Sequence, residues 1–259
     1  FSARADKTVL LRRLYMDLVG VPPSPETIVR FLEDDHPDNY LRMVEQLLST
    51  MRYGERWGRH WLDVARYADS QGFEGDNSIP NAWRYRDYVI KSFNDDKPYD
   101  QFVQEQIAAD EIWPDNLDLD PKRVYILAES KRRSMEARVG TGFFALSPQV
   151  AESALDAHRL KHETLTDWVD TTTSVFMGLT VGCARCHEHK FDPIPQQDFY
   201  RFLAYFNSLT ERAMDGNALL PPPSVKVPTA VQRADIDQQR LRIAAARKRI
   251  AATLSTVQY

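Results

Sequence analysis

The only two cysteines of the chain stand in the segment CARCH, at residues 183–187, with Cys183 and Cys186 three positions apart and His187 directly after them. One closely spaced pair excludes a disulfide framework, and it leaves a cysteine-rich zinc site short of ligands. The spacing is instead typical of c-type haem attachment. Two thiols can add to the vinyl groups on one edge of a porphyrin, and the next imidazole then reaches the iron. We therefore predict one covalent haem, with His187 as an iron ligand.

Other proteins use a C-x-x-C pair as a thioredoxin-like redox centre or as half of a zinc site. A thioredoxin motif follows a β-strand at the start of a helix in a βαβ unit. The sequence on both sides of residues 183–187 has helical periodicity instead. These surroundings favour haem attachment.

A second, distal ligand for the iron is not fixed by the sequence. His60 lies between Trp57 and Trp61 in an aromatic segment. It is either a distal ligand or catalytic base, or a core histidine bonded to a backbone group or a carboxylate. If the helix continues through this segment, His60 and Tyr67 share a face. We expect His60, Arg66 and Tyr67 to lie near the cofactor.

Two further residues near the motif are candidates for contact with the haem. Met177, six positions before Cys183, is the competing sulfur ligand, although helical methionines more often fill gaps in a core. His189 follows His187 too closely to reach the opposite face of the porphyrin. For His189 we predict a hydrogen bond to a haem propionate or to the loop at Asp192.

The remaining histidines carry weaker signals. His158 and His162 have the i, i+4 spacing of a helical metal pair, but the charged residues around them favour a solvated face. His36, in EDDHP, is most simply a loop residue.

The elements that must position these residues are predicted to be helices joined by short turns containing proline or glycine. Asp6 and Ser24 are expected N-caps, with Pro25 at the first helical position. Further helical patterns cover residues 7–20, 37–49, 53–72, 81–95, 98–112, 131–145, 161–178 and 195–209. Alternating strand patterns are lacking. We predict a mainly α protein, an irregular helical domain around one covalently bound haem, with a C-terminal extended helix.

A change in composition near the C-terminus predicts the domain boundaries. Residues 1–217 form the helical haem domain, and the Pro-rich stretch 218–229 is a connector that suits no core element. Residues 230–259 form a single long helix, which we expect to be the start of a downstream region. Its apolar residues recur every seven positions, at Ile236, Ile243, Ile250 and Val257. The intervening d positions are weakly apolar, so a helix along a neighbouring surface is favoured over a coiled coil.

The composition limits the classes of partner. Hydrophobic residues make up 43% of the chain and charged residues 27%, the balance of an ordinary globular domain. A net charge of -4 gives no basic face for nucleic acid. No apolar run approaches the roughly 20 residues that cross a bilayer. Residues 1–10 lack the apolar core of a signal peptide, so we expect the chain to be a segment of a longer precursor.

Three stretches resemble the Planctomycete-type cytochrome-associated family PSCyt2, also called DUF1549. The longest is TTTSVFMGLTVGCARCHEHKFDPIPQQDFYRFLAYFN (171–207), which is similar to the family's GLT-x-GCA-x-CHDHK-[FY]-DPI run. The others are LLRRLYMDLVGVPPSPE (10–26) and YGERWGRHWLDVARYADSQGFE (53–74). Glu188 replaces the usual Asp, Phe199 stands where Tyr is common, and residues 145–163 diverge. The resemblance extends from residue 10 to about residue 207.

This resemblance implies an exported haem protein, with a cytochrome-like domain upstream and a DUF1553 domain downstream. It also implies an association with proteins that process sulfated polysaccharides. We predict a c-type cytochrome domain in the periplasm or at the cell surface, which passes electrons to a redox partner protein or to the upstream cytochrome domain.

Two other functions remain open at this point. An open haem facing His60, Asp63, Arg66 and Tyr67 would suit a peroxidase-like oxidative enzyme, because peroxide cleavage uses a distal base beside an arginine. In a structural module, by contrast, the haem would only brace the fold. A six-coordinate iron favours electron transfer, and an open iron favours catalysis.

Overall fold

The computed structural model describes residues 5–70, 72, 76, 78–112, 129–146, 157–208 and 230–256. Over these ranges the chain is helical, and its only β pairing is an isolated bridge between Ser70 and Ser78. The prediction of a mainly α protein is therefore confirmed.

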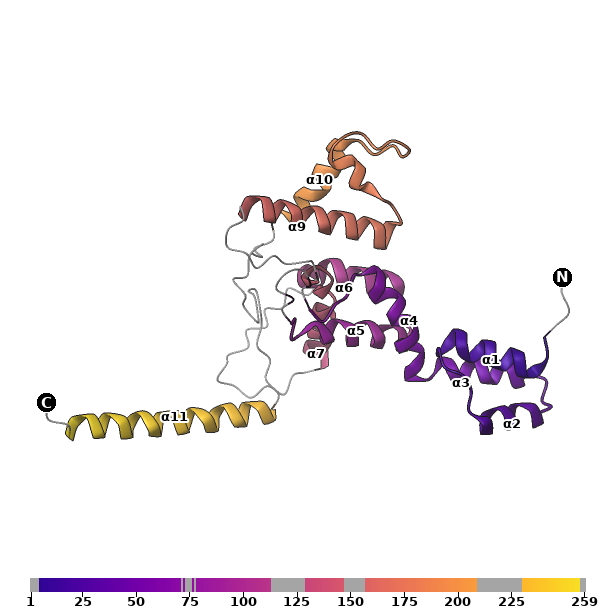
Figure 1. Cartoon of the computed structure of the whole chain (residues 1–259), viewed down its shortest axis with the longest axis horizontal. Helices are drawn as coiled ribbons and strands as arrows, with labels where there is room; N and C mark the ends of the chain where they lie inside the picture. Colours follow the sequence, from indigo (N-terminus) through magenta and orange to yellow (C-terminus); the bar gives the residue numbers. More distant parts are fainter. Residues whose placement is uncertain are drawn as a thin grey trace.

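The helices follow one another along the chain as shown in Figure 1. They are α1 (Lys7–Leu18), α2 (Pro25–Glu33), α3 (Asn39–Leu48), α4 (Met51–Val64), α5 (Ala82–Asn94), α6 (Tyr99–Ile112), α7 (Glu129–Val139), α8 (Gly142–Ala145), α9 (Ala157–Thr172), α10 (Gln196–Phe206) and α11 (Ala230–Thr256). A π-helical turn, η1 (Thr173–Met177), and a 3₁₀-helix, η2 (Val181–Arg185), lie between α9 and α10.

The first two helices begin at the predicted caps. The side chain of Asp6 accepts a hydrogen bond from the Val9 N–H at 2.9 Å, and Ser24 accepts one from Thr27 at 3.3 Å. Pro25 occupies the first turn of α2, where its missing N–H costs no helical hydrogen bond. Helices α1 and α3 then bury a small cluster of apolar side chains, Leu14, Val19 and Leu47.

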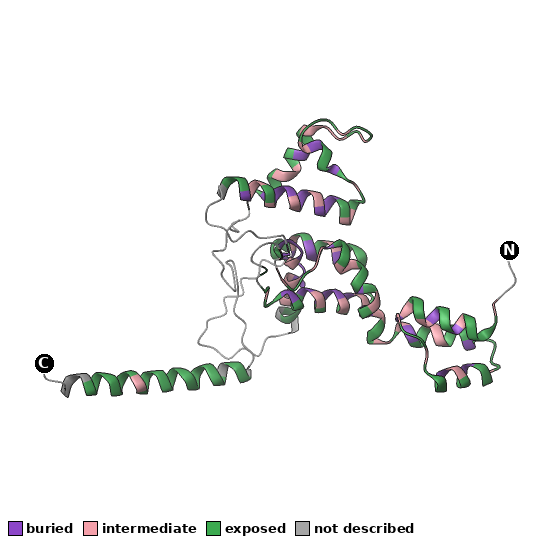
Figure 2. Ribbon diagram, in the orientation of Figure 1, coloured by how far each residue is buried: buried purple, intermediate pink, exposed green. Residues whose placement is uncertain are grey.

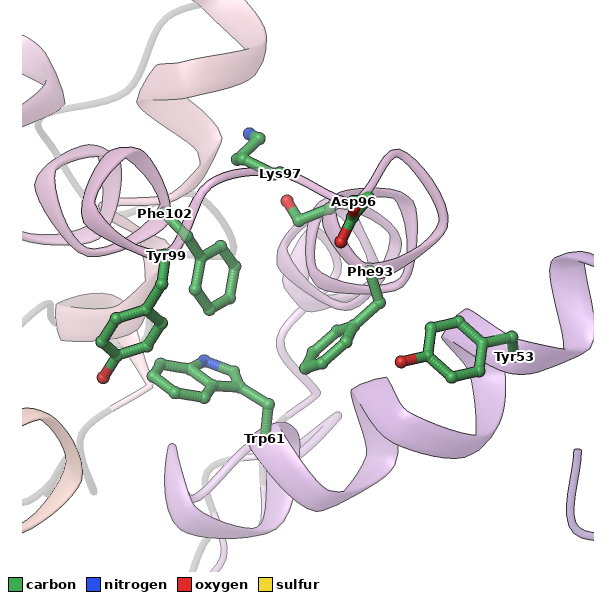
Figure 3. Close-up of a pocket in the computed structure, with 8 residues that line it drawn as sticks. Tyr53, Trp61, Phe93, Asp96, Lys97, Tyr99 and Phe102 are labelled. Atoms are coloured by element: carbon green, nitrogen blue, oxygen red, sulfur yellow. The ribbon is translucent and has the colours of Figure 1, made fainter. Parts of the chain in front are cut away.

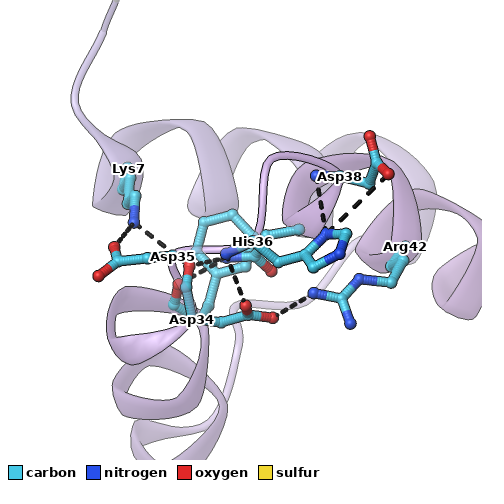
Figure 4. A network of polar contacts seen from close by, with 8 residues as sticks. Lys7, Asp34, Asp35, His36, Asp38 and Arg42 are labelled. Carbon is cyan, nitrogen blue, oxygen red and sulfur yellow. Dashed lines mark hydrogen bonds and ion pairs between the residues drawn. The ribbon is translucent and has the colours of Figure 1, made fainter.

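The loop between α2 and α3 is held by a surface network of charged groups (Figure 4). Asp34 pairs with Arg42 at 2.6 Å, and Asp35 pairs with Lys7 at 3.1 Å. His36 lies in this loop and accepts a hydrogen bond from the Asp38 N–H at 3.2 Å. Its simple loop role agrees with the sequence.

The larger core is shared by α4 to α10, and Figure 2 shows the buried residues on the facing sides of these helices. Helices α4 and α5 approach closely at Gly54, because a Cβ there would lie 2.4 Å from the Ile90 carbonyl oxygen. The Gly54 N–H also donates to Asn94 Oδ1 at 2.8 Å. An aromatic interior of Tyr, Trp and Phe side chains fills the space between these helices, among them Tyr85, Tyr88, Phe102, Phe143, Phe144, Trp168, Phe199 and Phe206.

Helix α4 ends earlier than the sequence predicts. The predicted helix reaches Gly72, whereas α4 ends at Val64, and Arg66 adopts a left-handed φ of 52°. The N–H groups of Arg66 and Tyr67 donate back to the carbonyls of Asp63 and Leu62, which is the Schellman pattern of a helix end. Tyr67 therefore does not continue the helical face of His60, and that expectation was wrong.

Helix α11 is exposed along its described length, apart from the half-buried Ala246. Three residues of the predicted seven-residue repeat, Ile236, Ile243 and Ile250, are exposed, and Val257 lies outside the described residues. The predicted connector also lies outside them, so the domain boundaries stay predictions. Among the described helices, none combines the length and the apolar character needed to cross a bilayer.

Candidate haem attachment site

The C-x-x-C-H motif lies in a short turn between α9 and α10. Gly178 reverses the chain after η1 with a left-handed φ of 64°, and η2 then carries Cys183. The N–H groups of Cys186 and His187 both donate to the Cys183 carbonyl, at 3.3 and 3.4 Å. This turn brings the two thiols and the imidazole into one compact segment.

Buried neighbours and side chains of α10 anchor the turn. Val181 and Ala184 are buried in the larger core. The Arg185 carbonyl accepts hydrogen bonds from Tyr200 Oη and Gln196 Nε2, both at 3.0 Å. The backbone of the motif is thus fixed to the domain from its inner side.

The groups with haem-binding chemistry are exposed. Cys183 and Cys186 are free thiols with exposed side chains, and His187 is also exposed. His187 Nδ1 lies 2.7 Å from the Glu188 carbonyl oxygen. Because a carbonyl can only accept, this contact is a hydrogen bond in the tautomer with the proton on Nδ1, in which Nε2 keeps its lone pair for a metal.

This donor set fits a haem iron. In the part of the chain that the structure describes, no three His, Cys, Asp or Glu side chains form a metal-ligand group. An iron in a porphyrin does not need such a group, since the macrocycle supplies four nitrogens and the protein adds axial ligands. Two accessible thiols for covalent attachment and one exposed imidazole for the iron are the groups that this turn offers.

His189 braces the loop that follows the motif. Its side chain is only 6% exposed, and its Nδ1 accepts a hydrogen bond from the Asp192 N–H at 2.9 Å. Its backbone N–H donates to the Ile194 carbonyl at 3.0 Å. His189 therefore bonds to the Asp192 loop, one of the two roles that the sequence favours.

An apolar cavity of about 230 Å³ adjoins the motif. Met177, the alternative distal ligand, is 59% exposed in its lining. The other lining residues come from α9, η1, η2, α10 and the loops between them, and they are mostly apolar: Val169, Thr173, Leu179, Val181, Pro193, Ile194, Asp198, Phe199 and Phe202. Such a surface suits contact with an apolar cofactor.

Asp170 of α9 lies directly against the backbone of the motif segment. A Cβ on Gly182 would stand 3.2 Å from both carboxylate oxygens of Asp170, so a larger residue would crowd them. Asp170 Oδ1 is buried without a hydrogen-bond partner. Burial raises the pKa of the Asp170 carboxyl, the nearby Asp167 raises it further, and Arg185 partly opposes the shift.

His60, Arg66 and Tyr67 engage different partners. His60 is exposed on α4, and its ring contacts Trp57 edge-on at 5.6 Å. Arg66 forms a two-point ion pair with Asp167 of α9. Tyr67 donates to Asp69 at 2.6 Å, and burial together with this hydrogen bond raises the pKa of its hydroxyl.

One aromatic contact links the His60 helix to the segment that leads into the motif. Trp61 of α4 and Phe176 of η1 have ring centroids 5.6 Å apart. Each is the sequence neighbour of a candidate distal ligand, His60 and Met177 respectively. The His60 ring itself contacts Trp57, and Met177 lines the cavity beside the motif, so the roles of both toward iron stay predictions.

The other predicted histidine pair does not resemble a metal site. His162 stacks on Tyr200 at 6.5 Å, and His158 is exposed near the start of α9.

Sequence reasoning did not identify Asp167 or Asp170, although two carboxylates one helical turn apart precede the motif. Their importance follows from contacts with Arg66 and Gly182, which the sequence does not reveal.

The chain matches the family described as PSCyt2, protein of unknown function (DUF1549), over residues 1–211. It belongs to this family. Comparison with curated proteins and with solved structures gave no match.

Proposed function

We propose that this chain holds one covalent haem c through Cys183 and Cys186, with His187 as an axial iron ligand, and that it transfers electrons. The observation that carries the proposal is the contact between the His187 ring and the Glu188 carbonyl. In the tautomer with the proton on Nδ1, the ring donates to this carbonyl at 2.7 Å, which leaves Nε2 as the ligating atom. The free, exposed thiols of the two cysteines support covalent attachment at the same turn.

The haem would supply a one-electron iron couple, and the residues of this chain would set its surroundings. Glu188 fixes the ring orientation of His187 through its carbonyl. His189 holds the following loop by accepting the Asp192 N–H. The buried Val181 and Ala184 hold the attachment turn, residues 181–187, against the core. The turn therefore need not rearrange when the charge on iron changes.

Electron transfer is favoured over peroxidase-like catalysis by the pairing of Arg66. Cleavage of peroxide needs a distal cation that is available to the developing charge. The Arg66 guanidinium is instead committed to Asp167. The distal ligand that we propose is His60, with Met177 as the competitor.

Attachment of haem c also implies location outside the cytoplasmic membrane, in the periplasm or at the cell surface. The partner would then be a redox protein or an upstream cytochrome domain of the same polypeptide. The proposed association with polysaccharide-processing proteins rests on family resemblance alone.

Intact mass after expression with cytochrome c maturation machinery tests covalent attachment. We expect the polypeptide mass plus one haem, and a pyridine haemochrome spectrum of c type. Cys183→Ala and Cys186→Ala should each lose a thioether, and His187→Ala should lose the normal Soret band. His36→Ala, a matched control in an exposed loop, should behave like the parent. A parent mass equal to the bare polypeptide would refute the proposal.

A second experiment identifies the distal ligand. His60→Ala should shift the Soret band and convert low-spin iron to high-spin iron, while both thioether bonds remain. Met177→Ala should leave the spectrum unchanged. The reverse pattern would assign the ligand to Met177, whose thioether ligation typically raises the reduction potential.

A further inference from the structure

A second cavity, separate from the attachment turn, lies where α4, α5 and α6 meet. Its volume is about 340 Å³, within the range of small-molecule sites. Figure 3 shows the aromatic side chains around it. Five rings belong to its lining: Tyr53, Trp61, Phe93, Tyr99 and Phe102.

The innermost rings are held by the core. Trp61 Nε1 donates to Tyr85 Oη at 3.1 Å and to Gln106 Oε1 at 3.0 Å. Its ring packs edge-on against Phe102 with centroids 4.8 Å apart. The indole is therefore fixed before any ligand arrives. The face of an aromatic ring carries the negative side of its quadrupole, so rings in the lining can attract a cation.

Tyr99 forms an outer wall of the cavity. It is 59% exposed at the start of α6, and it is the most exposed aromatic side chain of the lining. An exposed aromatic ring gives up little favourable interaction with water when a ligand covers it, and it gains apolar contact with that ligand.

Two charged side chains also line the cavity, and only one is available. The Lys97 ammonium is paired with the buried Glu105 and lies 4.5 Å from the centre of the Tyr88 ring. In Figure 3 it is turned away from the ring cluster. Asp96 is exposed, and within the described part of the chain it has no ion pair or hydrogen bond through its side chain.

The backbone fixes the position of this free carboxylate. Asp96 adopts a left-handed φ of 48° at the end of α5, where glycine is usual. The N–H groups of Asp96 and Lys97 donate to the carbonyls of Phe93 and Ser92 at 3.3 and 3.0 Å, which locks the turn. The Ser92 hydroxyl already donates to the Tyr88 carbonyl at 2.8 Å. The uncommitted charge at the cavity is thus negative.

We propose that this cavity binds a small quaternary ammonium compound, of the choline or betaine type. Aromatic faces attract a cation whose methyl groups prevent strong hydration, and a nearby carboxylate adds to this attraction. A metal ion or an ordinary ammonium would lose more hydration on entering a ring-lined site. Among the lining residues that the structure describes, the one cation, Lys97, is paired with Glu105, which argues against an anionic ligand.

Calorimetric titration of the haem-loaded full chain with choline tests the proposal. The neutral isostere 3,3-dimethylbutan-1-ol has the same shape without the charge. We expect choline to bind about tenfold more tightly, a difference of about 1.4 kcal/mol that cation–π and carboxylate contacts can supply. Equal affinities, or no binding of choline, would overturn the proposal. Tighter binding of a neutral sugar such as glucose would also overturn it and would indicate a carbohydrate site.

Variants locate the binding site. Tyr99→Ala should weaken choline binding about tenfold, because it removes the outer ring. Asp96→Asn should weaken it about fivefold while keeping the fold, since asparagine tolerates a left-handed φ. Asp100→Asn, on the same helix as Tyr99 but outside the lining, is the matched control and should bind like the parent. Unchanged binding in Tyr99→Ala, or an equal loss in Asp100→Asn, would show that choline binds elsewhere.

Discussion

Glu105 of α6 is a buried carboxyl group and Asp170 of α9 is a half-buried one, and their surroundings differ. Glu105 is 3% exposed and accepts hydrogen bonds from Tyr88 Oη and Gln101 Nε2, both at 2.8 Å. It also pairs with the Lys97 ammonium. Asp170 presses against Gly182 with Oδ1 buried and unpartnered.

The difference separates the region around Glu105, whose buried carboxylate has its partners, from the region around the attachment turn, where the Asp170 Oδ1 lacks one. A buried polar group stabilises the fold only when its partners are present, and otherwise it costs free energy. The partners of Glu105 all come from α5, α6 and the turn between them, so its burial needs no group from outside this region. The attachment turn leaves two thiols, an imidazole nitrogen and a carboxyl oxygen uncommitted. Uncommitted groups gathered beside one turn are expected where another molecule completes the structure.

The largest expected effect on the free energy of unfolding follows from removing Glu105, the carboxylate whose partners are all present. Glu105→Ala removes the partner of a nearly buried ammonium and of the Tyr88 hydroxyl together. Breaking a buried pair from one side costs about 3–5 kcal/mol. We expect urea denaturation to show the free energy of unfolding lowered by that amount.

Glu55→Ala provides the control for this prediction. Glu55 is exposed on α4, and its removal should change the free energy of unfolding by less than about 0.5 kcal/mol. If Glu105→Ala were equally mild, the buried network would not hold α5 and α6 together, and the contrast with the attachment turn would fail.

Local sequence signals predicted most of the helices. Periodicity placed α1, α3, α5 and α6 near their observed bounds, and the caps Asp6 and Ser24 act as expected. The end of α4 could not be predicted in this way. Arg66 ends the helix in a left-handed conformation without a glycine, and its partner Asp167 is 101 residues further along the chain.

The candidate sites also divide into one that local sequence predicts and others that depend on contacts between distant segments. The attachment turn was predicted because its chemistry depends on five consecutive residues, including Cys183 and His187. The aromatic cavity was not predicted, because Tyr53, Phe93 and Tyr99 come from three helices and meet only through folding. Asp170 was missed for the same reason, since its burial against Gly182 depends on how η2 packs on α9.

The smaller expected effect concerns Asp170, the carboxyl group whose buried Oδ1 lacks a partner, and here the substitution should raise the free energy of unfolding. Burial raises the pKa of the Asp170 carboxyl above its ordinary value of 3.8, so its ionised form destabilises the folded chain at neutral pH. Asp170→Asn should therefore raise the free energy of unfolding at pH 7. We expect a rise of only about 1 kcal/mol, because the carboxyl group is partly exposed and solvent screens its charge.

The pH dependence of this gain distinguishes removal of a charge from a general packing effect. A carboxyl whose folded pKa is raised contributes stability below its unfolded pKa and loses it as the pH rises through the folded pKa. The advantage of Asp170→Asn should therefore be largest at neutral pH and should shrink as the pH falls through the raised pKa, where the parent carboxyl takes up its proton. Urea denaturation of both proteins across this range measures the difference, with Asp17→Asn on the exposed face of α1 as the control. A gain that stays constant with pH would mean that the ionised Asp170 is not the source of the cost, and a loss at pH 7 would show that its carboxylate has a stabilising partner at the attachment turn.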